Sequence, residues 1–252
     1  MIPYFELQTL SLGPLTLNVW GLFVAFGFLA GIMFAYSLAR KQGRDPAHIL
    51  GMATWALPAA LIGARFVHVF FYDWSYYRMH GEDIIKIWEG GLASLGGQLG
   101  AAIAILLYIR WHHLRFWEWV DAIIIGVPLG IAIGRIGPFF GHLHPGIHSF
   151  FFLTVQYPEG ARHDLDLYLA LNGLILFSFF LFARYKQRPY GFFFVSFLLW
   201  YGTTRFLLDF LRAHNTAFAD PRFFGLTPAQ YGMIIYIILG ISFSLKSIRT
   251  QR

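Results

Sequence analysis

An arginine and three histidines lie close together near the middle of the chain. Arg135 stands near the end of a long apolar run, and His142, His144 and His148 follow it after Pro138. An arginine at the centre of a bilayer costs about 2.5–3.5 kcal/mol on insertion scales, so proteins keep one where it lines a polar cavity or pairs with a charge. We therefore expect a polar cavity here, with the rest of the chain forming a membrane scaffold around it.

The histidines are compatible with several roles. Their spacing could suit a metal, but no carboxylate lies among them and the spacing matches no strong zinc signature, so we expect no metal site. They could be ordinary loop histidines at a membrane interface, or one of them could remove a proton during group transfer, because neutral imidazole suits that work near pH 7. His163 is a further candidate base, since its neighbour Asp164 could orient it.

Composition predicts a membrane protein. The chain has 252 residues, of which 57% are hydrophobic and 13% charged, and its mean hydropathy is +0.56. A soluble domain carries about 25% charged residues. The absence of cysteine excludes disulfides, thiolate metal sites and a cysteine nucleophile in this chain. The net charge of +6 is concentrated in short loops, which indicates lipid headgroups and membrane topology rather than nucleic acid.

The apolar runs predict an all-α polytopic protein with about seven transmembrane helices, in a single integral membrane domain over residues 1–252. The start of the chain lacks the basic region of a cleavable signal peptide. We expect a small external loop region over residues 141–166, with a strand-like patch at 150–157. The predicted spans are 19–39, 49–71, 90–110, 119–139, 167–183, 192–208 and 229–245.

The third span begins in a glycine-rich run that includes Gly96 and Gly97. Small residues let helices approach closely in lipid, which is the simplest explanation of these glycines. Paired glycines at the entrance of a span could also bring backbone N–H groups close to an anionic headgroup.

Basic residues are distributed unevenly between the two sides of the predicted spans. Eleven lie on one side, five on the other, and Arg65, Arg135 and Arg205 lie inside spans, which accounts for all 19. The positive-inside rule then predicts a cytoplasmic C-terminus and an external N-terminus. With this orientation the three arginines inside spans share a similar depth, just below the outer headgroups.

Three guanidiniums at one depth favour a phosphate site, because each offers forked donors that match phosphate oxygens. The nearest abundant phosphate at that depth of a bacterial membrane is a phospholipid headgroup, so we expect a lipid substrate or ligand. The alternative is that each arginine reaches the surface or pairs with a carboxylate. The candidate partners are Asp73, Glu89 and Asp209.

Motifs along nearly the whole chain resemble those of the bacterial prolipoprotein diacylglyceryl transferase family. Residues 88–97 read W-E-G-G-L-A-S-L-G-G, and residues 121–137 read D-A-I-I-I-G-V-P-L-G-I-A-I-G-R-I-G. Any one motif is weak, but their order and spacing together are fairly specific. The other matching stretches are 17–22, 162–168, 201–206, 209–212 and 226–230.

The resemblance implies an enzyme of the bacterial plasma (inner) membrane that carries out the first step of lipoprotein maturation. The family moves the diacylglyceryl group of phosphatidylglycerol onto the lipobox cysteine thiol of a prolipoprotein, forming a thioether and releasing glycerol 1-phosphate. The implied partners are phosphatidylglycerol, the lipobox peptide and membrane lipids, with no cofactor and no nucleic acid. A cysteine-free enzyme fits this reaction because the substrate supplies the nucleophile.

The resemblance also implies roles for particular residues. Arg135 and Arg205 match the family's essential arginines by position and would stabilise charge on the departing phosphate. The candidate bases are His142, His144 and His163. The expected substrate-binding residues are Trp20, Arg65, Gly96, Gly97, Arg162 and Tyr201.

The chain departs from the family pattern around the base. Leu95, Pro138 and Leu143 stand where the family often has histidine, asparagine and an acidic residue. Asp164, Asp166 and Leu169 replace the usual proline, glutamine and glutamate. Two explanations follow: either a histidine of the 142–148 loop has taken over as the base, or the chain is a non-catalytic paralogue that binds anionic phospholipid or lipopeptide. A transporter or channel is disfavoured, since the sequence contains no inverted repeat and no clear mid-bilayer acidic relay.

Overall fold

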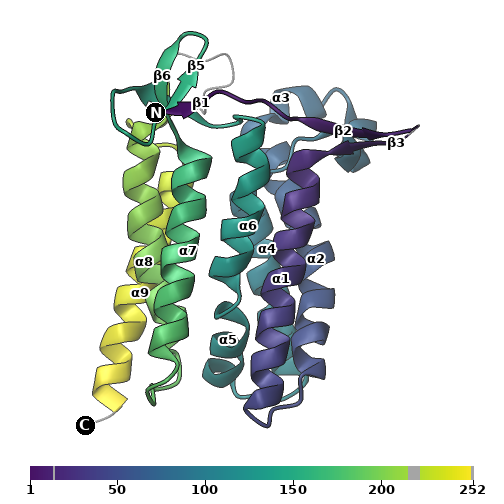
Figure 1. The fold of residues 1–252 in the computed structure, drawn as a ribbon. Helices are drawn as coiled ribbons and strands as arrows, with labels where there is room; N and C mark the ends of the chain where they lie inside the picture. Colours follow the sequence, from purple (N-terminus) through teal and green to yellow (C-terminus); the bar gives the residue numbers. More distant parts are fainter. Residues whose placement is uncertain (14, 215–221, 251–252) are drawn as a thin grey trace. The chain divides into compact units, whose positions relative to one another are not determined.

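Long helices dominate the computed structural model, which describes residues 1–13, 15–214 and 222–250 (Figure 1). Within the described residues, seven segments are long and apolar enough to cross a membrane, so the predicted all-α polytopic membrane fold is confirmed. The orientation of the termini stays a prediction, and Arg252, one of the basic residues on which it rests, lies outside the described residues. The seven segments are Val19–Lys41, Ala47–Tyr72, Ser94–Trp111, Phe116–Phe140, Leu165–Ala183, Phe192–Leu211 and Pro228–Leu245.

The fourth predicted span consists of two helices rather than one. A break at Ile125 and Gly126 separates them, and Pro128 lies in the first turn of the second helix, where the N–H that proline lacks is not needed. The helices are α1 Val19–Lys41, α2 Ala47–Val67, α3 Trp74–Tyr77, α4 Ser94–Trp111, α5 Phe116–Ile124, α6 Val127–Phe140, α7 Leu165–Ala183, α8 Phe192–Leu208 and α9 Pro228–Thr250. The shorter turns are the π-helical His68–Tyr72 and the 3₁₀-helical Gly81–Ile85, Ile87–Glu89 and Asp209–Leu211.

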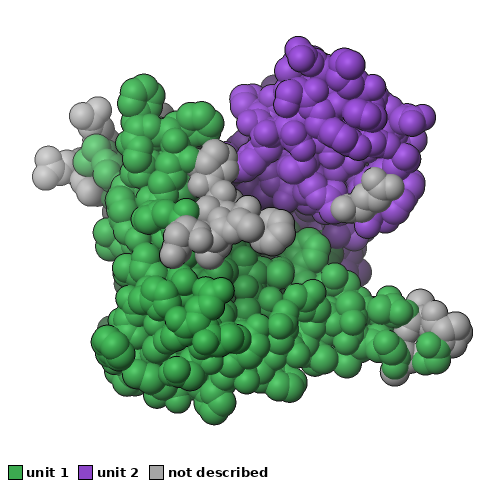
Figure 2. Space-filling view, turned by 90° about the horizontal axis from the view of Figure 1, so that it is seen from above, with its two compact units in different colours: residues 1–35, 120–252 green, residues 36–119 purple. Residues whose placement is uncertain are grey.

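The chain divides into two compact units, drawn in different colours in Figure 2. The first unit contains residues 1–35 and 120–252, and the second contains residues 36–119. That the whole chain forms a single membrane domain stays a prediction.

In the first unit, α6 packs on α7, α7 on α8 and α8 on α9. A four-stranded sheet has the order β1-β5-β6-β4, in which β1 pairs with β5 in parallel and the other pairs are antiparallel. Figure 1 places this sheet beside the start of α7, while α9 ends at the far end of the helices. The strands are β1 Ile2–Pro3, β4 Pro145–His148, β5 Val155–Tyr157 and β6 Gly160–Asp164, and a separate hairpin of β2 Thr9–Leu12 and β3 Leu15–Asn18 leads into α1.

The region predicted to be an external loop is therefore more ordered than the sequence predicts. The strand-like patch at 150–157 is a strand only over Val155–Tyr157, and α7 begins at Leu165, inside the predicted loop. Because β4 follows α6 closely and β6 runs directly into α7, the sheet fixes the adjoining ends of these two helices.

Helices α1 and α6 meet backbone to backbone. A Cβ added to Gly126 would lie 2.1 Å from the carbonyl oxygen of Gly31, and one added to Gly27 would lie 2.4 Å from the carbonyl oxygen of Gly130. Neither interface position has room for a side chain, which is the close approach that small residues permit between helices in lipid.

In the second unit, α2 and α4 pack in the same way. A Cβ on Gly96 would lie 2.2 Å from the carbonyl oxygen of Gly63, and one on Gly100 would lie 2.1 Å from that of Ala59. Gly97 differs, because its nearest neighbours would be Ala60 O at 3.5 Å and Ala64 Cβ at 3.6 Å, which are ordinary contacts.

These two adjacent glycines give a matched pair of substitutions. We expect Gly96→Ala to lower the free energy of unfolding by about 1–3 kcal/mol, because the added methyl group forces α2 and α4 apart. Gly97→Ala should change it little. Thermal unfolding of the detergent-solubilised variants measures both effects. Equal losses in the two variants would show that the Gly96 contact does not limit the approach of the helices.

Candidate active site

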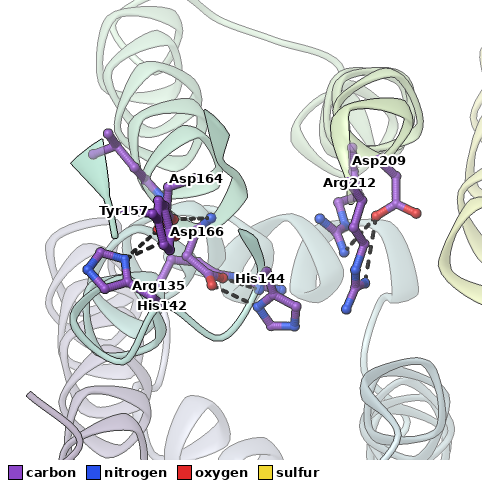
Figure 3. A network of polar contacts seen from close by, with 10 residues as sticks. Arg135, His142, His144, Tyr157, Asp164, Asp166, Asp209 and Arg212 are labelled. Atoms are coloured by element: carbon purple, nitrogen blue, oxygen red, sulfur yellow. Dashed lines mark hydrogen bonds and ion pairs between the residues drawn. The ribbon is translucent and has the colours of Figure 1, made fainter. Parts of the chain in front are cut away.

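Asp166, in the first turn of α7, joins two of the predicted site residues. Its Oδ1 lies 2.8 Å from a terminal nitrogen of Arg135 on α6, and its Oδ2 lies 2.7 Å from Nδ1 of His144 (Figure 3). The Asp166 side chain is fully buried, whereas those of Arg135 and His144 are 20% and 27% exposed. One buried carboxylate therefore holds a guanidinium and an imidazole that both reach solvent-accessible space.

The local sequence explains why Asp166 is placed so firmly. Asp164 is the N-cap of α7, and its Oδ1 accepts hydrogen bonds from the backbone N–H groups of Asp166 at 3.0 Å and Leu167 at 3.2 Å. Aspartate is favoured both at the cap and in the first turn of a helix, where it satisfies free N–H groups and the positive end of the helix dipole.

The second oxygen of Asp164 organises a neighbouring group of polar side chains. It lies 2.8 Å from Nδ1 of His142 and accepts a 2.8 Å hydrogen bond from the Tyr157 hydroxyl (Figure 3). Burial and the Asp164 carboxylate both raise the pKa of Tyr157, so this hydroxyl keeps its proton. The other ring nitrogen of His142 lies 3.1 Å from the carbonyl oxygen of Phe5, and the ring stacks on Tyr4. His142 thus ties the start of the chain to the sheet.

Arg205, near the end of α8, belongs to a second buried charged group. Its guanidinium lies 3.2 Å from Asp209 Oδ1. Arg212 lies 4.0 Å from the same oxygen (Figure 3). The other Asp209 oxygen accepts a hydrogen bond from the Thr227 hydroxyl. Arg205 therefore pairs with Asp209, four residues further along the chain. From the sequence, this ion pair is the alternative to a phosphate-binding role for Arg205.

The two charged groups lie close to each other at the sheet. Gly146 in β4 forms an antiparallel bridge with Arg212, and the N–H of Ala213 donates to the carbonyl of Pro145 at 3.2 Å. Arg135 and Arg205 lie near each other, and the buried Tyr201 of α8 lies near both. Two guanidiniums beside a phenol offer several hydrogen-bond donors, which suits the binding of an anion.

His163 and Arg162, both in β6, have mainly local partners. Nδ1 of His163 lies 2.6 Å from the Tyr168 hydroxyl, and burial lowers the pKa of His163. The buried Arg162 donates to the carbonyl of Gly146 at 3.3 Å and pairs with Glu159 at 3.2 Å. The bond from Arg162 joins β6 to β4, and the contact of His163 joins β6 to α7.

The second unit places Arg65 in a loop-organising position. Its buried guanidinium donates to backbone carbonyls of Ile84 at 2.8 Å, Gly90 at 2.7 Å and Gly91 at 3.1 Å, and also to those of Asp83 and Lys86. Its binding role stays a prediction, as does that of Gly96 and Gly97, which pack α4 on α2. Trp20, in the first turn of α1, is 42% exposed.

The structure adds two residues that the sequence had not proposed for the site. Asp166 connects Arg135 with His144, and Tyr157 connects to His142 through Asp164. The run Asp164-Leu165-Asp166, just before a predicted span, could have indicated these roles. Carboxylates near the membrane usually pair with basic side chains, and arginines and histidines were already predicted there.

The chain resembles known proteins along nearly its whole length. The family model described as prolipoprotein diacylglyceryl transferase matches residues 8–246. A phosphatidylglycerol–prolipoprotein diacylglyceryl transferase from Symbiobacterium thermophilum is 30% identical over 251 residues, which cover 96% of this chain and 92% of that protein. Proteins with the same name from Geobacillus kaustophilus and Burkholderia cenocepacia are 32% and 31% identical, over 92% and 99% of this chain and 89% and 97% of theirs.

Proposed function

Because the chain belongs to the prolipoprotein diacylglyceryl transferase family, we propose that it transfers the diacylglyceryl group of phosphatidylglycerol to the lipobox cysteine of a prolipoprotein. A thioether forms between the cysteine sulfur and the glyceryl carbon, the carbon–oxygen bond to phosphate breaks, and glycerol 1-phosphate leaves. The enzyme works as a multi-pass protein of the bacterial plasma (inner) membrane, with the sheet and the N-terminus on the external side.

The observation that carries this assignment is the pairing of Arg135 with Arg205 at one end of the helices. Each guanidinium pairs with one carboxylate, and the two charged groups meet at the sheet, where Gly146 bridges to Arg212. A phosphodiester bound there would meet two sets of forked donors. The leaving phosphate gains negative charge as its bond to carbon breaks, so the two guanidiniums would stabilise it more than they stabilise the substrate. Tyr201, which lies near both arginines, belongs to the proposed substrate-binding set. For Trp20 and Arg162, and for Arg65, Gly96 and Gly97 of the second unit, a role in substrate binding stays a prediction.

The proposed reaction can be tested directly with purified protein. Incubation with phosphatidylglycerol and a lipobox peptide should yield peptide carrying a diacylglyceryl mass, detected by mass spectrometry, together with an equal amount of glycerol 1-phosphate. The same peptide with serine in place of cysteine should give no product, and phosphatidylethanolamine should not replace phosphatidylglycerol. Binding of phosphatidylglycerol without either product would contradict the proposal and indicate a lipid-binding paralogue.

A further inference from the structure

We propose that His144 is the base that takes the proton from the lipobox thiol, and that Asp166 is the positioning residue that holds His144 and Arg135 in one arrangement. This inference rests on the transferase function proposed above and assigns one step of it to named atoms.

The hydrogen bond to Asp166 determines which nitrogen of His144 can act. A carboxylate only accepts hydrogen bonds, so Nδ1 of His144 carries the hydrogen that points to Asp166 Oδ2, at 2.7 Å. Nε2 is then left with a lone pair, and no described residue forms a hydrogen bond with it. Because the side chain is 27% exposed, this nitrogen is accessible to a substrate. A base oriented by a carboxylate on its far side is the arrangement that activates nucleophiles in many hydrolases.

The backbone also holds His144 in place. The carbonyl of His144 accepts a 3.2 Å hydrogen bond from the N–H of Leu165, and the next residue, Pro145, is paired with Asp164 across the sheet. The histidine, its carboxylate and Arg135 are therefore positioned by the same junction between β6 and α7, before any substrate binds.

The other described histidines of this region fit the role less well. Both ring nitrogens of His142 face acceptors, Asp164 and Phe5 O, and its side chain is only 5% exposed. His163 has a phenol as its ring partner, which cannot neutralise a protonated ring, and burial lowers its pKa. His148 is exposed, and no ion pair joins it to a described carboxylate.

The proton and the electrons balance in a single displacement. The thiol proton passes to Nε2 of His144, and the sulfur attacks the glyceryl carbon next to the phosphate. The carbon–oxygen bond breaks, its electron pair stays on the phosphate beside Arg135 and Arg205, and the imidazolium passes its proton to that phosphate or to water. Asp166 stabilises the imidazolium while it exists.

Charged and titratable groups from several elements lie near His144. Asp166 faces its ring from α7, and Arg135 on α6 shares that carboxylate. Asp164 in β6 is the backbone partner of Pro145, the residue after His144. Arg212, which follows α8, forms a backbone bridge with Gly146, and its side chain pairs with Asp209. The neighbouring histidines are His142, which pairs with Asp164, and His163, whose pKa is lowered.

The pH dependence of His144→Gln tests the assignment, because glutamine can still donate a hydrogen bond to Asp166 but cannot accept the thiol proton. At pH 7 we expect turnover to fall by about 10²–10⁴-fold, the usual contribution of a general base. A cysteine thiol with a pKa of about 8.5 is about 30 times more ionised at pH 9.5 than at pH 7, so the deficit relative to wild type should shrink by about that factor. Asp166→Asn should show a smaller deficit that shrinks in the same way.

Two controls separate this proposal from the function on which it rests. His148→Gln, four residues along the chain, should match wild type at both pH values. Arg205→Lys should be equally impaired at both, because its defect lies on the phosphate side. A wild-type enzyme without product would overturn the transferase function itself.

The base assignment is overturned if His144→Gln turns over near normally at pH 7, or if its deficit persists undiminished at pH 9.5. Phosphatidylglycerol retained by the purified variant verifies its fold. If His144→Gln does not fold, the same pH comparison on Asp166→Asn decides the question.

Discussion

Replacing Arg135 or Arg205 by lysine should lower the rate of diacylglyceryl transfer by about 10²–10³-fold, which is the usual loss when one donor to a developing anion is removed. Lysine keeps the positive charge but loses the forked pair of donors that matches phosphate oxygens. Arg135 would also lose its geometry toward Asp166, which it meets at 2.8 Å. The initial rate of product formation with phosphatidylglycerol and a lipobox peptide, followed by mass spectrometry, measures the effect.

Arg188→Lys provides the matched control in the same unit. Arg188 is exposed beyond the end of α7 and donates to the carbonyl of Ala183 at 3.3 Å. Its substitution should leave transfer unchanged. Near-normal rates for both Arg135→Lys and Arg205→Lys would mean that the forked donors of these arginines do not act on the leaving phosphate.

Replacing Asp209 by alanine should lower the free energy of unfolding by about 3–5 kcal/mol, the usual cost of removing one partner from a buried ion pair. Asp209 is fully buried and faces Arg205, Arg212 and the Thr227 hydroxyl, so its loss leaves a buried guanidinium without its nearby negative charge. Denaturant unfolding in detergent micelles measures the change.

Asp73 is exposed, so Asp73→Ala should change the free energy of unfolding by less than about 1 kcal/mol, and this variant serves as the control. The double variant Arg205→Met/Asp209→Leu should recover part of the stability lost in Asp209→Ala, because it removes the pair rather than one partner. It should remain inactive if Arg205 acts on the phosphate. A stable Asp209→Ala protein would show that water or another group solvates the arginines.

The helices could be predicted from the sequence because their ends are marked by charge and turn residues. The first span, predicted over 19–39, is α1 Val19–Lys41, which ends in Arg40 and Lys41 before the left-handed Gly43. The break between α5 and α6 could not be predicted in this way. Pro128 is compatible both with the interior of a kinked span and with the first turn of a new helix.

The polar partners could be predicted only where they are close in sequence. Arg205 and Asp209 are four residues apart on one helical face, so their pairing follows from helix geometry. His144 and Asp166 are 22 residues apart, and they meet because β4 pairs with β6, two strands too short to have a readable alternation pattern. The acceptors around Arg65 are backbone carbonyls. Every residue carries one, so the sequence could not show which of them Arg65 would contact.

The glycine contacts between α1 and α6 limit how this protein can be engineered. Glycine-to-alanine changes in helices ordinarily stabilise a protein by about 0.4–1 kcal/mol, because they reduce the freedom of the unfolded chain. At Gly27, Gly31 and Gly126 that route is closed, since the added methyl group would overlap a backbone carbonyl. Gly21 has no neighbouring atom within 4 Å of an added Cβ, so a thermostable variant for structural work should begin at that position and leave the α1–α6 contact unaltered.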